Sequence, residues 1–300
     1  MINYADGREY DLVFDEEKHS YTVDGEKVHS VTRVIDACFP KHLVDWAVDE
    51  GVKAYQNEMD KVPSKDGLYE LEQTHAELIE ERIKTAYKEK GDHAANIGNI
   101  VHEWIRNRIN GDDADPWQDT HVNACQNAFL EWEASHEIEW IDAERKVYAY
   151  DADEGHRYAG TVDAVAIVDE HPFVIDFKTS KKIYKEYYLQ VAAYAKAVWQ
   201  MGDYQTDYDG MILRLDKETG KFQEKAFSAW EHYEMFVNCM DLKNWNSKRI
   251  KILPSIRFKK RNSEDMAGYI YLPITINSTD VIINSLENFI VNNREITLPN

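Results

Sequence analysis

The chain has 300 residues, of which 43% are hydrophobic and 12% aromatic, so it can form one large domain or two small ones. Asp and Glu outnumber Lys and Arg by 55 to 35, and the net charge of −20 argues against a nonspecific nucleic-acid coat protein. No apolar run reaches the length of a membrane span and the N-terminus lacks a signal pattern, so we expect a cytoplasmic protein without a membrane partner.

The N-terminal part of the chain predicts a hairpin followed by helices. Residues 10–14 and 19–24 alternate between apolar and polar, with Asp24-Gly25 as a turn. Apolar residues then recur at helical spacing in four segments, which cover residues 30–37, 43–55, 70–90 and 94–109. Two polar segments predict loops, one over residues 58–69 and one over residues 111–120, after the last of these helices.

The second half of the chain alternates between strand and helix patterns. A helix over residues 121–136 precedes a strand over residues 141–150 and two strands within residues 160–178. The elements predicted after them are a helix over 189–200, a hairpin over 210–227, a helix over 230–244 and a helix over 281–292.

The segment at residues 160–178, GTVDAVAIVDEHPFVIDFK, carries the most informative pattern. Its first strand bears Asp163 and its second bears Asp176 and Lys178, which share a face because side chains alternate along a strand. Two carboxylates and an ammonium at the end of a core strand are costly to bury unpaired. They predict a divalent cation with an anionic substrate, although an isolated Asp-x-Lys is more often an edge salt bridge.

Further motifs accompany this segment in a fixed order. Gly98-x-x-x-His102 precedes it and Gln190-x-x-x-Tyr194 follows it. Glycine one turn before His102 would let that helix approach the sheet or a substrate closely. The series resembles the RecB-like branch of the PD-(D/E)xK nuclease superfamily, which includes phage exonucleases, CRISPR-associated adaptation nucleases and the mitochondrial genome maintenance exonuclease.

The N-terminal segment is similar to phage-type and mitochondrial-type members of this branch. The similarity lies in four short pieces, which are YTVDG at 21–25, SVT at 30–32, Pro40-Lys41, and Leu43 with Trp46-Ala47. The whole resemblance covers roughly residues 15–230. It implies an α/β fold with a PD-(D/E)xK restriction-endonuclease-like core, in which a small mixed sheet is flanked by helices.

The resemblance also implies the roles of the motif residues. In the family the metal ligands correspond to His102, Asp163, Asp176 and the backbone carbonyl of Phe177, and the metal is Mg²⁺ or Mn²⁺. Oxygen ligands suit both ions, and an imidazole increases tolerance of Mn²⁺. Asp163, Asp176 and Lys178 are the expected catalytic residues, with Lys178 orienting or deprotonating the attacking water, a role for which a lowered pKa would suit it.

Other residues are candidates for substrate or metal contacts. Gln190 and Tyr194 lie one helical turn apart, and the resemblance implies that they contact the substrate strand near the scissile phosphate. Four residues at the strand exit suit phosphate contacts, namely Thr179, Ser180, Lys181 and Lys182. Glu144 could help to hold a second metal, and an ordinary surface carboxylate is an equally good interpretation of it.

Two cofactors are not expected. Some relatives carry an iron–sulfur cluster on four cysteines, whereas this chain has only the scattered Cys38, Cys125 and Cys239, which we expect to be reduced thiols. A phosphate-binding G-x-x-x-x-G-K-[S/T] loop is absent from the sequence, so we expect no bound nucleotide and no fused ATPase.

The sequence therefore predicts a metal-dependent deoxyribonuclease, more an exonuclease than an endonuclease, acting in phage or bacterial recombination or replication. Single-stranded or end-bearing DNA is the expected partner, and the acidic net charge suggests a protein that delivers it. Two alternatives stay open: a structure-specific or nicking endonuclease on the same site, and a catalytically idle module for DNA binding or complex assembly.

The predicted domain organisation places the nuclease in residues 1–245 and a basic extension in residues 246–300. The nuclease part divides into a hairpin-and-helix region, residues 1–92, and a catalytic core, residues 93–245. Residues 243–261 contain no acid and eight cations: Lys243, Lys248, Arg249, Lys251, Arg257, Lys259, Lys260 and Arg261. We expect this stretch to form part of a DNA path or a partner-binding face.

Overall fold

The computed structural model describes residues 2–3, 7–40, 43–65, 68–69, 73–112, 119–150, 155–202, 207–247, 258–260 and 268–270. It divides the chain into two compact units, Met1–Leu242 and Lys243–Asn300. In the second unit, β13 (Phe258–Lys260) and β14 (Gly268–Ile270) form an antiparallel pair. The predicted helix over 281–292 and most of the basic stretch lie outside the described residues.

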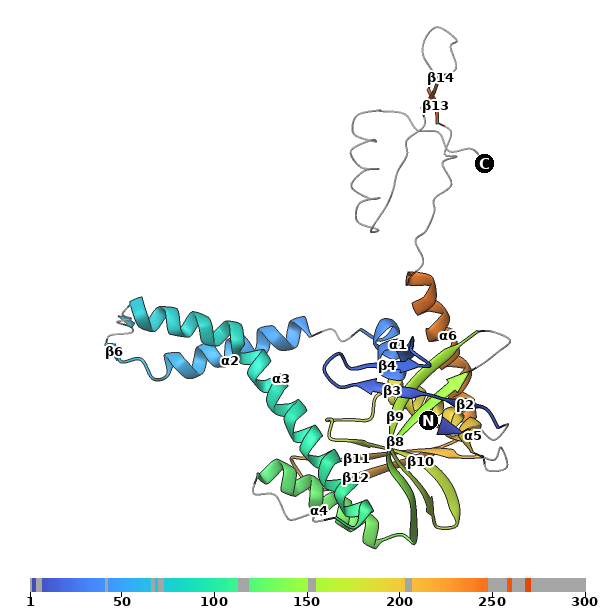
Figure 1. The fold of residues 1–300 in the computed structure, drawn as a ribbon. Helices are drawn as coiled ribbons and strands as arrows, with labels where there is room; N and C mark the ends of the chain where they lie inside the picture. The colour runs from blue at the N-terminus through green and yellow to red at the C-terminus, as the bar shows by residue number, and fades with distance from the viewer. Residues whose placement is uncertain are drawn as a thin grey trace. The chain divides into compact units, whose positions relative to one another are not determined.

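The first unit is built on an eight-stranded sheet flanked by helices (Figure 1). Its strands are β3 (Leu12–Asp15), β4 (Ser20–Val23), β5 (Glu26–Ser30), β8 (Ile138–Tyr150), β9 (Arg157–Val168), β10 (His171–Lys178), β11 (Asp209–Leu215) and β12 (Phe222–Phe227). Its helices are α1 (Val31–Cys38), α2 (Val44–Met59), α3 (Gln73–Asn110), α4 (Thr120–Ala134), α5 (Lys185–Met201) and α6 (Trp230–Ser247). Short strand pairs add β1 (Ile2–Asn3), β2 (Glu9–Tyr10), β6 (Ser64–Lys65) and β7 (Leu68–Tyr69).

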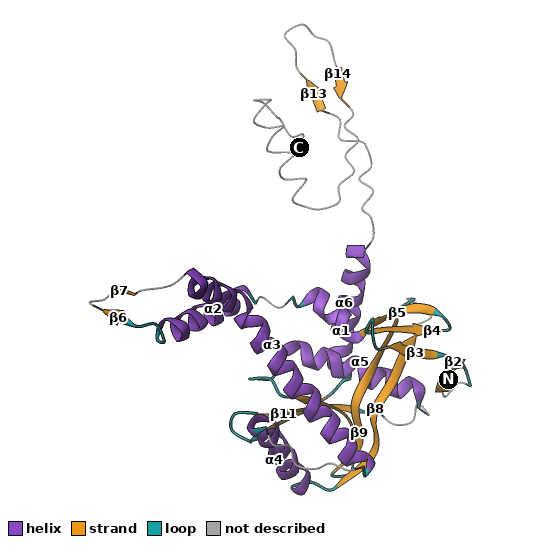
Figure 2. Ribbon diagram, turned by 60° about the vertical axis from the view of Figure 1, so that its left-hand side comes forward, coloured by secondary structure: helices purple, strands orange, loops and turns teal. Residues whose placement is uncertain are grey.

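The sheet is mixed, which makes the fold α/β as the sequence predicts. Strand order is β12-β11-β10-β9-β5-β4-β3, and β8 pairs with the other edge of β9. The β10–β11 and β5–β9 pairs are parallel, and the remaining pairs of this sheet are antiparallel. Figure 2 shows the helices, in purple, lying beside the orange strands of this sheet.

Both faces of the central strands β9, β10 and β11 are buried, and each face carries its own hydrophobic core. On β11, Ile212 packs with α1, α5 and α6, whereas Met211 and Leu213 pack with α3 and α4. On β10, Val174 belongs to the first core, and Ile175 and Phe177 belong to the second. A strand covered on both sides needs apolar residues at nearly every position, which explains the continuous apolar runs in the sequence.

The β9–β10 hairpin closes with the polar turn that the sequence predicts. Asp169 and Glu170 have φ angles of 48° and 70°, and Val168 pairs with His171. Two central residues with positive φ match the right-handed twist of the flanking strands. The turn therefore fixes the register that places Asp163 and Asp176 near the open end of the hairpin.

Two strands, β5 and β10, pair with different parts of the same edge of β9 and diverge between them, and we call this divergence the fork. Because β8 pairs along β9 from Arg157 to Val168, the pairings with β5 and β10 must share the other edge. There β5 pairs with Tyr158 and Ala159, and β10 pairs from Ala164 onward. Residues 160–163 are thus unpaired on that edge, and the fork brings side chains of β9, β10 and neighbouring helices together.

Helix α3 differs from the prediction of two helices over 70–90 and 94–109. It is continuous from Gln73 to Asn110. Gly91 costs a helix only about 1 kcal/mol, and the packing of α2 extends past it. Glu50 of α2 binds Lys90 at 2.8 Å, and a Cβ on Gly91 would lie 3.7 Å from Trp46. The contacts with α2 therefore stabilise α3 as a continuous helix across Gly91.

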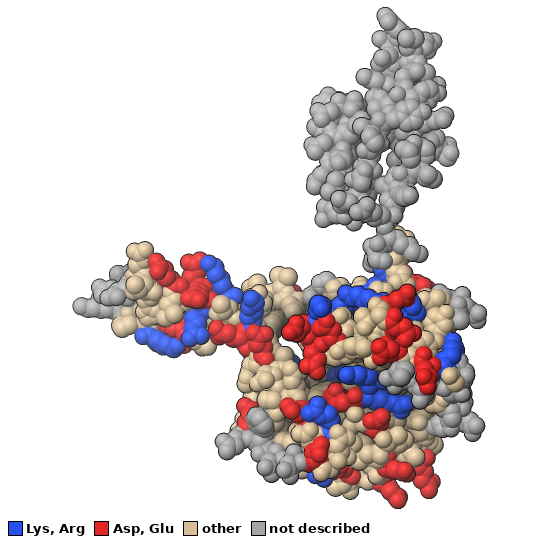
Figure 3. All heavy atoms as spheres, in the orientation of Figure 1, with Lys and Arg blue, Asp and Glu red and all other residues tan. Residues whose placement is uncertain are grey.

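Acidic and basic side chains are interspersed over the face of the first unit shown in Figure 3. The net charge of −20 is therefore not concentrated into a continuous acidic surface on this face. None of the helices in the described part of the chain is both long and apolar enough to cross a membrane.

Candidate active site

The Asp163 carboxylate lies at the fork and uses its two oxygens differently. Oδ2 accepts a hydrogen bond of 2.8 Å from the backbone N–H of Phe177, which takes the place of a ladder bond between β9 and β10. Oδ1 lies 3.4 Å from Nδ1 of His102 on α3. This backbone contact fixes the rotamer of Asp163 and also places the backbone of Phe177 beside the carboxylate.

Asp176 and Lys178 form an ion pair on one face of β10. Nζ of Lys178 lies 2.6 Å from Oδ2 of Asp176, whose side chain has no exposed surface. Neither Asp176 oxygen receives a well-directed hydrogen bond from the residues that the structure describes. The ring of Phe177 points to the opposite face and lies 6.3 Å from the ring of His102, as strand alternation predicts.

Among the described residues, one group of His, Cys, Asp or Glu side chains is close enough to hold a metal ion. Ligand atoms of His102, Glu144 and Asp163 all lie within 4.8 Å of one another, and each side chain is half-buried. His102, Asp163 and Glu144 are all among the predicted ligands, Glu144 as a possible ligand of a second metal, whereas the predicted ligand Asp176 does not belong to this group. Asp176 instead forms the ion pair with Lys178, within electrostatic range of Asp163 and His102.

Glu144 reaches the group through an unusual backbone conformation. It has a φ of 53°, which is uncommon for a residue other than glycine and carries strain in a strand. Its neighbours Ala143 and Arg145 pair with Ala164 and Val162, so Glu144 lies directly across from Asp163. The sequence pattern places Glu144 in a strand, but it gives no sign of this left-handed conformation.

A chain of hydrogen bonds connects Lys178 to α5. Lys178 Nζ donates to Oε1 of Gln190 at 3.3 Å, and Nε2 of Gln190 donates to the hydroxyl of Tyr194 at 3.3 Å. Tyr194 is only 3% exposed, so it cannot contact a substrate strand as predicted. Its place is behind the site, where it holds Gln190 and, through it, the ammonium of Lys178.

Two residues beside Lys178 have no counterpart in the predicted site. Nζ of Lys178 lies 4.8 Å from the centroid of the half-buried Tyr187 ring, a cation–π distance. Arg214 of β11 donates to the backbone oxygen of Ser180 at 3.1 Å and also binds Asp216 at 3.1 Å. Arg214 could have been suspected from sequence as the only basic residue of its strand.

The other predicted substrate residues lie at the exit of β10. Thr179 and Ser180 are half-buried, whereas Lys181 and Lys182 are exposed. Ser180 is held in a turn by a hydrogen bond of 2.9 Å from its hydroxyl to the backbone oxygen of Lys182. A Cβ on Gly98 would lie 3.5 Å from Oγ1 of Thr179, which is ordinary contact, so the described residues do not require glycine there.

Mutual electrostatics set the protonation of these groups. Burial raises the pKa of Asp176 to about 6, and the nearby Asp163 carboxylate adds to this although Lys178 opposes it. Burial would lower the pKa of Lys178, but the carboxylates of Asp176 and Asp163 outweigh it, so the pKa is raised. This direction is opposite to the lowered pKa that a general base would need, so Lys178 is an ammonium in this arrangement.

The pKa values of His102, Asp163 and Glu144 are also shifted. Burial opposes protonation of His102, but the Asp163 carboxylate outweighs it and raises the pKa of the imidazole. Conversely, burial disfavours the Asp163 carboxylate, but His102 outweighs that effect and the pKa of Asp163 is lowered. Burial and then the charge of Asp163 raise the pKa of Glu144. The raised pKa values of His102 and Glu144 reflect the nearby Asp163 carboxylate, whereas the lowered pKa of Asp163 reflects the nearby His102.

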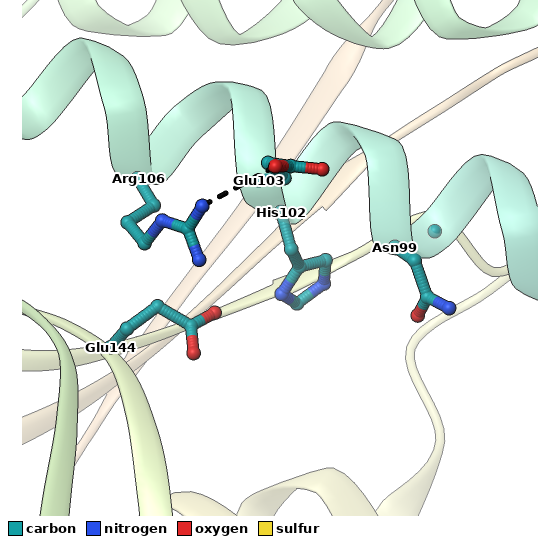
Figure 4. A pocket seen from close by; sticks show the side chains of 6 residues that line it. Asn99, His102, Glu103, Arg106 and Glu144 are labelled. Atoms are coloured by element: carbon teal, nitrogen blue, oxygen red, sulfur yellow. Dashed lines mark hydrogen bonds and ion pairs between the residues drawn. The ribbon is translucent and has the colours of Figure 1, made fainter. Parts of the chain in front are cut away.

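An open cleft of about 420 Å³ gives access to the group. It is lined by Gly98, Asn99, His102, Glu103, Arg106 and Glu144. Figure 4 shows His102 and Arg106 projecting from α3 toward Glu144, with Glu103 beside Arg106. A ligand in this cleft would touch the metal-ligand candidates on one side and the guanidinium of Arg106 on the other.

The residues present fit a divalent cation. The group combines one imidazole with two carboxylates, a donor set that suits Mn²⁺ and Mg²⁺. Oδ2 of Asp176 is paired with the ammonium of Lys178, whereas its buried Oδ1 has no hydrogen-bond partner among the described residues and could accept further positive charge. His102, Glu144 and Asp163 would hold the cation.

Comparisons with known proteins do not identify the chain. Its sequence matches no family model and no curated protein. Among solved structures it is similar to one titled "Crystal structure of SSO0001", with a TM-score of 0.30 and 14% identity. That match covers 70% of this chain and 90% of the other.

Proposed function

We propose that this protein is a metal-dependent deoxyribonuclease of the RecB-like PD-(D/E)xK type. The observation that carries the proposal is the metal-ligand group of His102, Glu144 and Asp163 next to the buried Asp176–Lys178 pair. A salt bridge at a sheet edge would not need a histidine from another helix, nor a glutamate held at a φ of 53°. The ordered motifs and this convergence support the same function.

Phosphodiester hydrolysis requires charge neutralisation at the phosphate and an oriented water. A divalent cation, when bound, supplies the neutralisation and lowers the pKa of coordinated water. The chain's own residues supply the orientation. The ammonium of Lys178, fixed by Asp176 and Gln190, can donate a hydrogen bond to the attacking water or to a phosphate oxygen.

Tyr194 and Gln190 hold this ammonium in place, and Phe177 holds Asp163 in place. Both contacts come from main-chain or buried groups, so the reacting side chains have little freedom. Such preorganisation reduces the reorganisation needed during reaction. DNA is the proposed substrate, with single-stranded or end-bearing molecules favoured and exonucleolytic cutting favoured by the resemblance.

The test is cleavage of end-labelled single-stranded DNA with Mg²⁺ or Mn²⁺. Lys178→Ala should reduce the rate by at least ~100-fold, the usual scale for help with proton transfer or charge at the reacting group. Lys225→Ala is the matched control, because it removes the same charge from an exposed position on β12. Comparing circular with linear DNA separates an endonuclease from an exonuclease.

Calorimetric titration with Mn²⁺ provides a readout that does not depend on activity. Wild type should bind the ion, and Asp163→Asn should weaken binding because it removes a ligand from the group. Absence of both Mn²⁺ binding and cleavage would overturn the proposal and favour an idle DNA-binding or assembly module. Near-normal cleavage by Lys178→Ala would reduce the Asp176–Lys178 pair to a structural salt bridge.

A further inference from the structure

The cleft contains one cation that the site described above does not use. Of the residues that line it, Arg106 alone carries a positive charge at every physiological pH. It belongs to none of the predicted motifs. Its chemistry differs from that of its neighbours, because a guanidinium is suited to recognise phosphate and not to bind a metal ion.

Helical geometry puts Arg106 on the same face as His102. Asn99, His102 and Arg106 follow one another at intervals of three and four residues, so they form a row along α3. The adjoining face of α3 is fixed by Val101, which is fully buried, and by Ile105, at 1% exposure. The helix therefore cannot rotate, and Arg106 projects into the cleft about one turn, roughly 5.4 Å, beyond His102.

The described contacts of Arg106 are long. Nη2 lies 3.5 Å from Oε1 of Glu103 and 3.4 Å from Oδ1 of Asn107, and the side chain is 38% exposed. Arg108, two residues further along α3, provides the contrast. Its guanidinium lies 2.6 Å from Oε2 of Glu133, and its Nε donates to the same oxygen at 2.7 Å. Arg106 can therefore exchange its protein partners for a ligand at small cost, whereas Arg108 is held in an ion pair with Glu133.

Glu103 is the group that an incoming anion would displace. Its side chain is 65% exposed and holds the guanidinium only at 3.5 Å. A phosphate group carries a comparable charge, and two of its oxygens can accept two parallel N–H bonds from one arginine. An exposed ion pair of this kind contributes little, about 0–1 kcal/mol, so a phosphate would replace it at small cost.

We infer that Arg106 binds a backbone phosphate of the nucleic-acid strand, next to the phosphate that lies at the metal-ligand group, and that Glu103 occupies the guanidinium until the strand arrives. This inference deepens the proposed function and rests on it. The strand would then run along α3 through the cleft, contacting His102 and Arg106 from adjacent phosphates. Asn99, on the other side of His102, can extend this row with an amide.

The experiment measures binding of a fluorescent single-stranded oligonucleotide by anisotropy over a range of KCl concentrations. The full-length Lys178→Ala protein is used as the parent with Mg²⁺ present, so that cleavage does not interfere. Arg106→Gln should weaken binding and reduce the log–log salt slope by about 0.7, the value for one phosphate contact on a single strand. Arg106→Lys keeps the charge but loses the planar fork, so its affinity for the oligonucleotide should lie between that of the parent and that of Arg106→Gln.

Glu103→Gln should change the affinity for the oligonucleotide in the direction opposite to Arg106→Gln. It frees the guanidinium and should tighten binding, an effect that should disappear when Arg106→Gln is also present. If the gain persists in the double variant, Glu103 acts by direct repulsion and the competition is refuted. A purely structural role for the pair would weaken binding in both single variants.

Arg108→Gln is the matched control, since it removes the same charge from the same helix but from the pair with Glu133. It should leave the salt slope unchanged. Mn²⁺ binding to Arg106→Gln should also be unchanged, which assigns Arg106 to the strand and not to the metal. If the parent binds the oligonucleotide and Arg106→Gln binds with the same affinity and slope, the assignment of Arg106 alone is overturned. If the parent does not bind and the wild-type protein does not cleave the oligonucleotide, the deoxyribonuclease proposal fails as well.

Discussion

Gly160 of β9 is predicted to be indispensable to the packing behind the site. An alanine Cβ at this position would lie 2.4 Å from Cε1 of Tyr194, 3.3 Å from Cζ and 3.4 Å from Cδ1. Carbon atoms in contact normally stay about 3.5–4.0 Å apart. The ring of Tyr194 is rigid and 3% exposed, so the overlap can be relieved only by moving the ring or β9.

The expected cost follows from overpacking of a buried site. Gly160→Ala should lower the free energy of unfolding by about 1–3 kcal/mol. For a unit of this size that corresponds to a fall in Tm of roughly 2–4 °C for each kcal/mol. Because Tyr194 holds Gln190, and Gln190 holds Lys178, the displacement should also disturb the ammonium.

Gly98→Ala is the matched comparison and should have the opposite sign. Gly98 lies within α3, and its Cβ would make only ordinary contact with Thr179. Alanine is favoured over glycine inside a helix by about 0.5–1 kcal/mol. Gly98→Ala should therefore be as stable as wild type or more stable.

The assay is urea unfolding followed by tryptophan fluorescence and circular dichroism, with the m-value compared between variants. Repeating Gly160→Ala in a Tyr194→Leu background should reduce its cost, because the ring that it meets is gone. A Gly160→Ala protein within about 0.5 kcal/mol of wild type would refute the packing described for Tyr194. A large loss in Gly98→Ala would show that α3 approaches the sheet more closely than the contact with Thr179 indicates.

Three further predictions concern hydrogen bonding, pH and thiol reactivity. Tyr194→Phe removes the acceptor for Gln190 and should slow DNA cleavage by roughly 2–10-fold, the equivalent of one hydrogen bond, with Mn²⁺ affinity unchanged by calorimetry. Lys53 and Lys90 lower the pKa of Glu50, so its stabilisation is present above the ordinary glutamate pKa and is lost as pH falls through the lowered value. Glu50→Gln should thus lower the free energy of unfolding by about 1 kcal/mol at pH 7 and by much less at pH 3, and an equal loss at both pH values would contradict this. Burial raises the pKa of Cys125 to about 12, so native protein at pH 8 should resist iodoacetamide at Cys125 while the half-exposed Cys38 reacts, as peptide mass spectrometry would show.

The sequence by itself determined the features that depend on local periodicity. Alternation along one strand put Asp176 and Lys178 on one face and Phe177 on the other, and the polar turn at residues 169–172 fixed the hairpin. The mixed α/β sheet flanked by helices also follows from the order of apolar runs and helical stripes. These properties need only neighbours in the chain.

The tertiary structure decided which of these side chains meet. The fork exists because β5 and β10, distant in sequence, pair with the same edge of β9. Glu144 joins His102 and Asp163 through a positive φ that packing imposes on a residue whose own preference is against it. Tyr194 is buried by its approach to Gly160, and α3 runs through Gly91 because α2 packs along it. Pairing and packing between distant segments leave little trace in local sequence, since the free energy that fixes them comes from contacts formed only when the chain is folded.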